Sequence, residues 1–512
     1  MKRTVLLGFI GLCIPFSSQA VEFRTPGTAL GIGGAGVARN NGGLTSYWNP
    51  AAGAFKNSPL AIGAGVGGGI KGSDGLAENV DRLSNVDFGN LRSFNTTSVT
   101  DVGNFAKTIS IIDDISKRSG NISITGQVPV GVAINSFSFG IFGNISGYIL
   151  PIADMINILP QATGTNAVIN TNALSSAIGV TPYTPSGYFT TAQLATLATA
   201  IKDNSNPAAP LTQAESENLA NAIDNQLLNS TIPADQALSA LKDTALPVLK
   251  NTTTTTFNKN TTSVSIKAIQ YIEIPFSYGY PVKISSKGTL GVGVTAKLIS
   301  GTVYQNQVLL ANRSDNNLNA NDLLDEITNN QKRSSGFGVD LGALYKFDNW
   351  LGVGLVAKNI NSPKFTGPDY FKPQYNSLTN KVEVTQLTPG ESVELKPQVR
   401  AGIAADVLSW INVAADLDLT ENETVAPGTL IGSSLKSKNF GGGVEIHPVS
   451  WLKVRGGAYK NLSASNGGGV LTAGFKVFLL DVDGAFATNT FKIDGKELPQ
   501  EVQINASLNF SF

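Results

Sequence analysis

Strict alternation of apolar and polar residues recurs along this chain. It is clearest at 502–512, where every second side chain from Val502 to Phe512 is apolar and those between are polar. Because successive strand side chains point to opposite faces, the alternation predicts a strand with one apolar and one polar face. The same period predicts fourteen strands, at 60–66, 128–134, 137–149, 264–280, 290–298, 337–347, 351–357, 393–407, 411–419, 440–446, 452–458, 471–479, 480–486 and 502–512.

The connections between these strands fall into two kinds. Short turns are predicted near 135–136, 348–349, 408–409, 448–450 and 479–480. The connections after the first and third strands run to about 60 and about 110 residues, lengths uncommon in a compact soluble domain. Short turns on one rim and long loops on the other are typical of an outer-membrane barrel, whereas a soluble sandwich or barrel is the alternative. We therefore expect an all-β membrane protein, an antiparallel barrel of about 14 strands spanning 60–512.

Aromatic residues mark one rim. Three of the four tryptophans, Trp350, Trp410 and Trp451, stand beside predicted short turns. Tryptophan favours the membrane–water interface, so we expect a periplasmic aromatic rim, with hairpin anchors of a soluble barrel as the alternative. The closing Phe510 and Phe512 are expected to serve as a signal for the outer-membrane barrel assembly machinery rather than to end an ordinary strand.

Residues 1–20 have the composition of an export signal. Lys2 and Arg3 precede an apolar stretch at 5–15, and small residues end the segment at Ser18 and Ala20. This is the pattern of a secretory signal peptide, which is too short to anchor a protein in a membrane. We expect cleavage after Ala20 and a location in the bacterial outer membrane, in contact with its lipid.

Composition excludes several classes of function. Only 14% of residues are charged, and 37 basic residues balance 37 acidic ones, so nothing suggests a nucleic-acid partner. One Cys and one His exclude a zinc site made of those ligands and a disulfide within the chain. His447 lies at a predicted turn without an evident nucleophile, so we expect neither an enzyme nor a cofactor.

One loop has the spacing of a calcium site. Asp315, Asn317, Asn319 and Glu326 occupy relative positions 1, 3, 5 and 12 of such a loop. Ala320 stands where that loop needs glycine, so an ordinary Asn-rich outer loop is the alternative.

The segment 21–59 does not alternate well enough to form a wall strand. It is rich in glycine, including Gly33, Gly34 and Gly36, and carries almost no charge. Because small residues let a backbone approach a wall closely, we expect this segment to lie inside the lumen. Six charged residues expected to face the lumen could pair with one another or anchor the segment: Glu394, Lys396, Arg400, Asp406, Asp416 and Asp418.

A resemblance rests on residues 27–53, which include Asn49, Pro50 and Ala51. This run resembles the N-terminal hatch of the outer-membrane channels for long-chain fatty acids and other hydrophobic compounds, the FadL/TodX family. It is most similar to a branch known as TraF-like plasmid-transfer proteins. The resemblance implies a 14-stranded barrel, a hatch at 21–59 and passive uptake of a hydrophobic ligand of the fatty-acid or aromatic type, with the hatch shifting to open a route.

Two outer segments depart from that pattern. Helical spacing of apolar residues is predicted in the loop 71–127 and in the insert 151–262, at 191–200, 213–228 and 234–249. Such helices form either a small cap whose apolar faces pack against one another or an exposed apolar surface that collects apolar ligands. A different class of function therefore stays open, a surface or assembly component of conjugal transfer that binds a partner through this insert.

Overall fold

The computed structural model describes residues 25–39, 41–55, 59–72, 99–117, 122–154, 156–157, 182–205, 210–228, 232–246, 257–311, 329–348, 350–425, 436–449, 451–464, 467–493 and 496–512. The predicted signal peptide at 1–20 and the four candidate calcium ligands, Asp315, Asn317, Asn319 and Glu326, lie outside these residues.

Fourteen antiparallel strands close into one barrel in sequence order, as predicted. The barrel closes where β1 pairs with β22, from Ala61 opposite Ser511 to Lys71 opposite Glu501. Its strands are β1 (Leu60–Gly72), β2 (Ile122–Ile134), β3 (Phe137–Ile152), β4 (Ser263–Lys283), β5 (Gly288–Leu309), β6 (Gln331–Phe347), β7 (Leu351–Lys358), β12 (Gln398–Leu408), β13 (Ile411–Asp418), β16 (Asn439–Val449), β17 (Leu452–Asn461), β18 (Val470–Val477), β19 (Leu480–Ala487) and β22 (Glu501–Ser511).

The barrel is apolar outside and polar inside, the reverse of a soluble protein. On β4, Ile274 and Phe276 point outward and are 38% and 59% exposed. On the lumen side, Lys267, Lys297 and Arg455 are at most 3% exposed. Such a surface is stable only where lipid replaces water, so the barrel spans a membrane.

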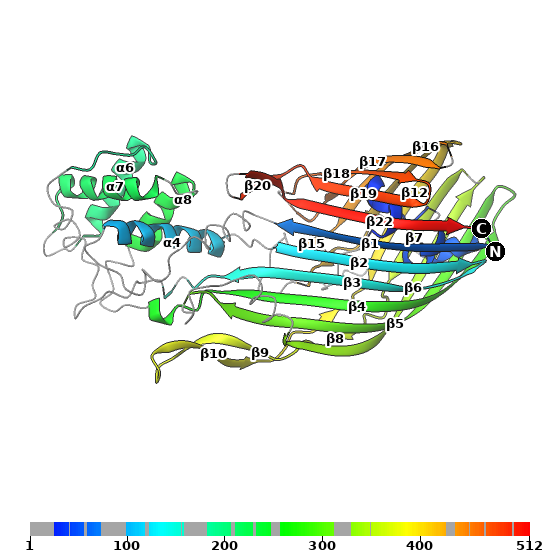
Figure 1. Cartoon of the computed structure of the whole chain (residues 1–512), viewed down its shortest axis with the longest axis horizontal. Helices are drawn as coiled ribbons and strands as arrows, with labels where there is room; N and C mark the ends of the chain where they lie inside the picture. The colour runs from blue at the N-terminus through cyan, green and yellow to red at the C-terminus, as the bar shows by residue number, and fades with distance from the viewer. Residues whose placement is uncertain are drawn as a thin grey trace, which may run out of the picture.

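The two rims differ as the loop lengths predict. The short turns gather at one end with the C-terminus, and the helices lie beyond the other end (Figure 1). Trp350, Trp410 and Trp451 lie in turns of the short-turn rim and are 45–47% exposed. Phe512, which follows β22 at the same rim, is 69% exposed, and Phe510 pairs with Ile62.

The helices form a cap with a core of its own. It contains α4 (Val99–Lys117), α6 (Thr191–Asp203), α7 (Gln213–Leu227), α8 (Ala234–Ser239) and the π-helical turn η5 (Ala240–Ala245). Capping boxes at Thr190 and Thr212 begin α6 and α7. Phe105, Leu197 and Leu219 are at most 2% exposed within one cluster. No helix among the described residues is long and apolar enough to cross a bilayer.

Polar contacts tie together the two ends of the insert that carries most of the cap. The Thr261 amide donates to Asp154 Oδ2 at 3.0 Å, and Asn260 Nδ2 donates to the Asn157 carbonyl at 2.7 Å. Burial alone would raise the pKa of Asp154, but the hydrogen bonds from Asn157 and Thr261 hold that pKa below its usual value. The insert therefore leaves and re-enters the barrel at one polar junction.

Four small two-stranded sheets lie on the outer connections, and one of them changes a predicted boundary. The predicted strand 393–407 is divided, because Pro397 cannot donate to a ladder. Glu394 and Lys396 therefore lie outside the barrel strands. The two-stranded sheets are β8 (Lys364–Phe365) with β11 (Val393–Glu394), β9 (Tyr370–Asn376) with β10 (Lys381–Thr388), β14 (Asn422–Glu423) with β15 (Lys436–Ser437) and β20 (Thr490–Ile493) with β21 (Lys496–Pro499).

The apolar exterior predicts a depth-dependent cost for a buried charge. Val294 on β5 points outward and lies six positions after Gly288, where the strand begins at the rim. At roughly 3.4 Å per residue and about 40° of strand tilt, Val294 is roughly 15 Å from the rim. We expect Val294→Arg to lower the free energy of unfolding from lipid vesicles by about 2–4 kcal/mol. Val282→Arg, at the rim, should cost about 0–1 kcal/mol in the same denaturant titration. Equal costs would contradict this placement of the membrane.

Candidate functional site

The candidate site is the barrel lumen and the segment that fills it. Residues 25–55, which we name the hatch, form short helical turns inside the barrel: η2 (Gly27–Ile32), η3 (Gly42–Leu44), α1 (Thr45–Trp48) and η4 (Pro50–Ala54). Gly33 has a φ of +69°, and a Cβ there would lie 2.4 Å from the Ala458 carbonyl oxygen. A Cβ on Gly43 would lie 2.1 Å from the Gly63 nitrogen. Glycine lets the hatch backbone touch the wall.

Polar groups of the wall hold the hatch backbone. Asp416 Oδ2 on β13 accepts hydrogen bonds from the Gly36 and Val37 amides, at 2.8 and 3.0 Å. The hydroxyl oxygen of Thr472 on β18 accepts from the Gly33 amide at 3.1 Å. These contacts satisfy backbone groups that would otherwise be buried without partners.

An ion-pair network joins the hatch to the neighbouring strands β16, β17 and β19. Arg39 Nη2 lies 3.0 Å from Glu445 Oε2, and Glu445 also binds Lys453 and Arg455, at 2.9 and 2.8 Å. Arg455 in turn lies 2.5 Å from Asp481. The alternation of signs allows these charges to remain buried.

The Asn49-Pro50-Ala51 motif forms a wedge against β4, β5 and β6. Asn49 is fully buried; its side chain accepts from the Ala51 amide at 3.0 Å and donates to the Ala343 carbonyl at 3.2 Å. Pro50 is the first residue of η4, where no N–H is needed. A Cβ on Gly342 would lie 2.1 Å from Asn49 Oδ1, so the wall is shaped to the motif.

Aromatic rings connect the hatch to β3. Tyr47 packs edge-on against Phe142 with ring centroids 5.3 Å apart, and against Trp48 at 5.7 Å. Trp48 Nε1 donates to the Pro26 carbonyl at 3.2 Å, and its ring occupies the space that a side chain on Gly36 would need. On the other face of Tyr47, Lys358 Nζ lies 3.3 Å from the ring centroid. Both the predicted Gly36 and the motif at Asn49 thus belong to one packed unit.

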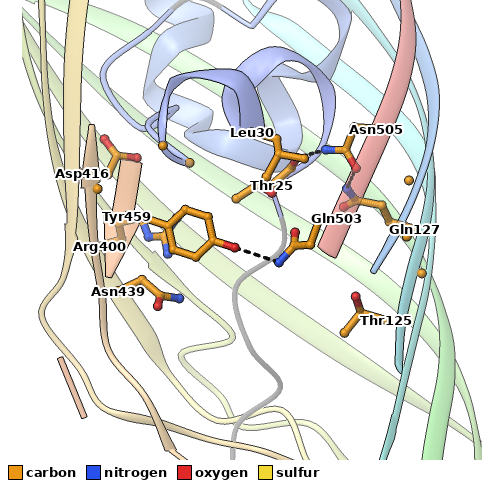
Figure 2. Close-up of a pocket in the computed structure, with 16 residues that line it drawn as sticks. Thr25, Leu30, Thr125, Gln127, Arg400, Asp416, Asn439, Tyr459, Gln503 and Asn505 are labelled. Atoms are coloured by element: carbon orange, nitrogen blue, oxygen red, sulfur yellow. Dashed lines mark hydrogen bonds between the residues drawn. The ribbon is translucent and has the colours of Figure 1, made fainter. Parts of the chain in front are cut away.

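The hatch separates two cavities. The chamber, on the outer-loop side, is an open-sided hollow of about 620 Å³, solvent space included, and is lined by polar side chains of several strands (Figure 2). The vestibule, at the short-turn rim, encloses about 850 Å³ and is lined by residues including Arg39, Lys346, Trp350 and His447. Gly33 and Gly34 of the hatch face the chamber.

A second closure lies above the chamber. Phe365 of β8 is fully buried, and its ring fills the space that a side chain on Gly301 would need. It belongs to an apolar cluster with lumen-facing Tyr271 and Ile299. Lys267 Nζ lies 2.8 Å from Glu391 of the same outer connection. The chamber therefore has the hatch below it, and this folded connection packs against the lumen side of β4 and β5 above it.

The other residues singled out in the sequence lie at the short-turn rim or in ion pairs of the wall. His447 Nε2 lies 2.8 Å from the Ser409 carbonyl oxygen at the rim, and Asp406 accepts from Asn412 there. Arg400 and Asp418 pair at 2.6 Å, one of the two arrangements expected for the lumen charges. Sequence reasoning missed Arg39, although a lone cation in an almost uncharged lumen segment was a signal that it needs an acidic partner.

The fold and its plug together define a class, a β-barrel of the bacterial outer membrane closed by its own N-terminal segment. Within that class, the chain belongs to the family described as F plasmid transfer operon, TraF, protein, whose sequence profile matches residues 46–418. The predicted TraF-like branch is thereby confirmed. No curated protein matches the chain.

Solved structures similar to the chain include hydrocarbon channels. The Pseudomonas putida toluene transporter TodX has 12% identity and a TM-score of 0.41, over 96% of this chain and 99% of that one. The Ralstonia pickettii toluene transporter TbuX has 10% identity and a TM-score of 0.42, over 95% and 98%. A Pseudomonas aeruginosa FadL homologue has 10% identity and a TM-score of 0.40, over 96% and 99%.

Asp416 provides a direct test of how the hatch is held. Hydrogen bonds to a charged group contribute about 1.5–3 kcal/mol each, so Asp416→Leu should speed amide exchange at Gly36 and Val37 more than tenfold. Hydrogen–deuterium exchange of the detergent-solubilised protein measures this. Glu383→Leu removes a carboxylate on the outer strand β10 and should leave hatch exchange unchanged. If Asp416→Leu also leaves it unchanged, Asp416 does not hold the hatch.

Proposed function

We propose that this protein is an outer-membrane channel that passes hydrophobic small molecules by diffusion, and that they leave the lumen sideways into lipid. The proposal rests on one observation, the gaps in ladder pairing on both flanks of the β2–β3 pair, close to the chamber floor.

The first interruption lies between β1 and β2. Their pairing runs from the outer end to Gly67 opposite Gln127 and resumes at Ala64 opposite Val130. Between these points, Gly65 and Val66 have no ladder partner on β2 among the described pairs. The residue opposite Gly65 is Pro129, which cannot donate a hydrogen bond. Because Gly67 and Gln127 line the chamber, the missing ladder pairs lie directly beside it.

The second interruption lies between β3 and β4. Phe142 pairs with Glu273 and Phe139 pairs with Phe276, but Gly140 and Ile141 have no ladder partner on β4 among the described pairs. Pro275 stands opposite Gly140 and again removes a donor. A strand proline and a strand glycine both weaken a sheet at the point where they stand.

Phe142 closes the second gap on the lumen side. Its ring Cζ lies 3.2 Å from where a Cβ on Gly140 would be, and the Val130 carbonyl oxygen of β2 lies 2.5 Å from the same point. In the proposed route, Phe142 rotates away from Tyr47 and β3 separates from its neighbours at Gly140, while the hatch backbone stays in place. An apolar molecule could then pass from the lumen to lipid and never enter the aqueous periplasm, which lowers the cost of its transfer.

Disulfides across the interruptions test this route. Val66→Cys with Val128→Cys, and Ile141→Cys with Ile274→Cys, would each staple one gap on its outward face. We expect either staple to reduce uptake of radiolabelled toluene into proteoliposomes at least fivefold, and a reductant to restore it. The single natural cysteine, Cys13, lies in the predicted signal peptide and would not interfere.

Matched controls place the same staples where the ladder is intact. Ile70 pairs with Ile124, and Ile145 pairs with Gln270, both close to the gaps and on the outward face. These pairs should form disulfides without changing uptake. Uptake that survives both gap staples would refute the sideways route, and uptake no faster than in empty liposomes would refute the channel itself.

A second candidate function is that of a surface component in conjugal transfer. Two observations favour it: the family description names a plasmid transfer operon, and the helical cap has a buried core independent of the lumen. A domain built in this way is suited to binding a partner at the cell surface.

Deleting residues 160–255 separates the two functions. The contacts of Asp154 with Thr261 and of Asn157 with Asn260 flank the deletion and should close the shortened loop. Because the chamber and both gaps lie below the cap, we expect toluene uptake to stay within twofold of the full chain. Plasmid transfer frequency, measured in the same cells, should fall if the cap serves conjugation. Loss of uptake would instead assign ligand collection to the cap.

A further inference from the structure

The chamber has no free positive charge for an anionic ligand. Its two charged lining residues are Arg400 and Asp416. Arg400 Nε lies 2.6 Å from Asp418, and Asp416 accepts from the hatch amides of Gly36 and Val37. A carboxylate entering the chamber would therefore compete with an existing ion pair for Arg400.

Neutral hydrogen-bonding groups make up most of the remaining polar lining. Four carboxamides face the chamber, from Gln127, Asn439, Gln503 and Asn505, together with the hydroxyl of Tyr459 (Figure 2). They come from β2, β16, β22 and β17, so they converge from separate parts of the wall.

The hydrogen bonds among these groups determine which atoms are left over. Asn505 Nδ2 donates to the Thr25 carbonyl at 2.6 Å, and a carbonyl can only accept, so Asn505 presents Oδ1 to its other neighbour. Gln127 Nε2 donates to that Oδ1 at 3.1 Å. Gln127 Oε1 is then a buried acceptor with no partner among the described residues. Such an atom is costly unless a ligand or water donates to it.

Gln503 on β22, two strands from Gln127 along the same side of the wall, has a similar arrangement. Its Nε2 donates to the Glu501 carboxylate at 2.7 Å and to the Tyr459 hydroxyl at 3.0 Å, which leaves Oε1 as its free acceptor. The chamber therefore offers two fixed acceptors, Gln127 Oε1 and Gln503 Oε1, and its complement is a group that donates hydrogen bonds.

The apolar chain of such a ligand would point towards the gap in pairing between β1 and β2. The first wall gap begins directly below Gly67 and Gln127, and its lumen side carries Gly65, Pro129 and the neighbouring ring of Phe142. A head group held by Gln127 would place its tail towards this gap and the lipid beyond it.

From this geometry we infer that the chamber binds neutral amphiphiles whose head donates hydrogen bonds, such as a primary amide or an alcohol, in preference to carboxylates or plain hydrocarbons. The inference rests on the proposed function and narrows it to one class of cargo. A hydrocarbon would leave both glutamine acceptors unpaired, and a carboxylate would bring acceptors to face them.

Binding of three probes with the same chain length tests the inference. The full chain is placed in lipid nanodiscs, because sugar-headed detergents would themselves occupy a site for neutral donors. Saturable binding of radiolabelled dodecanamide, laurate and dodecane is then measured against empty discs. We expect dodecanamide to bind at least tenfold more tightly than the other two. Equal or tighter binding of laurate or dodecane, or saturable binding of none of the three, would overturn the inference.

Two variants show whether the chamber is responsible. Gln127→Leu should weaken dodecanamide at least tenfold and leave dodecane unchanged, whereas Gln374→Leu on the exposed hairpin strand β9 should change neither. Unchanged dodecanamide binding in Gln127→Leu would overturn the inference. The stapling experiment on toluene decides the channel separately, so a channel with a different cargo would be recognised as such.

Discussion

The exchange of water for lipid as the outer solvent determines how this chain folds. In lipid, every backbone polar group must be paired within the protein, and a closed barrel is the one sheet that leaves no edge unpaired. The outward faces then bury their apolar side chains in lipid, as Ile274 and Phe276 do. The lumen therefore receives the polar half of every strand, and the protein must pair those groups internally.

The hatch is the consequence of that internal constraint. A lumen lined with groups such as Asp416, Glu445 and Arg455 would require water or partners for each of them. The hatch supplies partners from its backbone amides at Gly36 and Val37 and from the one charge of Arg39. Its glycines allow this close approach, and its near absence of other charges avoids adding ions that the wall could not pair. The hatch and the wall therefore supply hydrogen-bond and ion-pair partners to each other.

The sequence predicted the barrel more completely than the site. All fourteen wall strands follow from the period of two, because lipid and lumen impose opposite demands on alternate residues. The period of two underestimates the strands beyond the membrane: β5 continues to Leu309, although the predicted strand ends at 298. The pairing of Arg39 with Glu445 joins residues far apart in the chain, which no local pattern reveals. The wall gaps had a local signal, prolines at 129 and 275 within strands, but only the register shows that they flank the same hairpin.

A molecule could leave the lumen past the hatch, past the outer connection or through the wall beside β2 and β3. Each route requires different contacts to be broken. Displacing the hatch would remove two hydrogen bonds to Asp416 and the ion pair of Arg39, each worth about 1.5–3 kcal/mol for a charged hydrogen bond. Opening the outer connection would remove the pair of Lys267 with Glu391 and expose Phe365. At Gly140, by contrast, ladder pairing with β4 is already missing, and the Phe142 ring packs there against Tyr47. An aromatic pair of this kind contributes about 0.5–1.5 kcal/mol, less than the hydrogen bonds that hold the hatch, which is why we propose the side of the barrel as the exit for a molecule that is soluble in lipid.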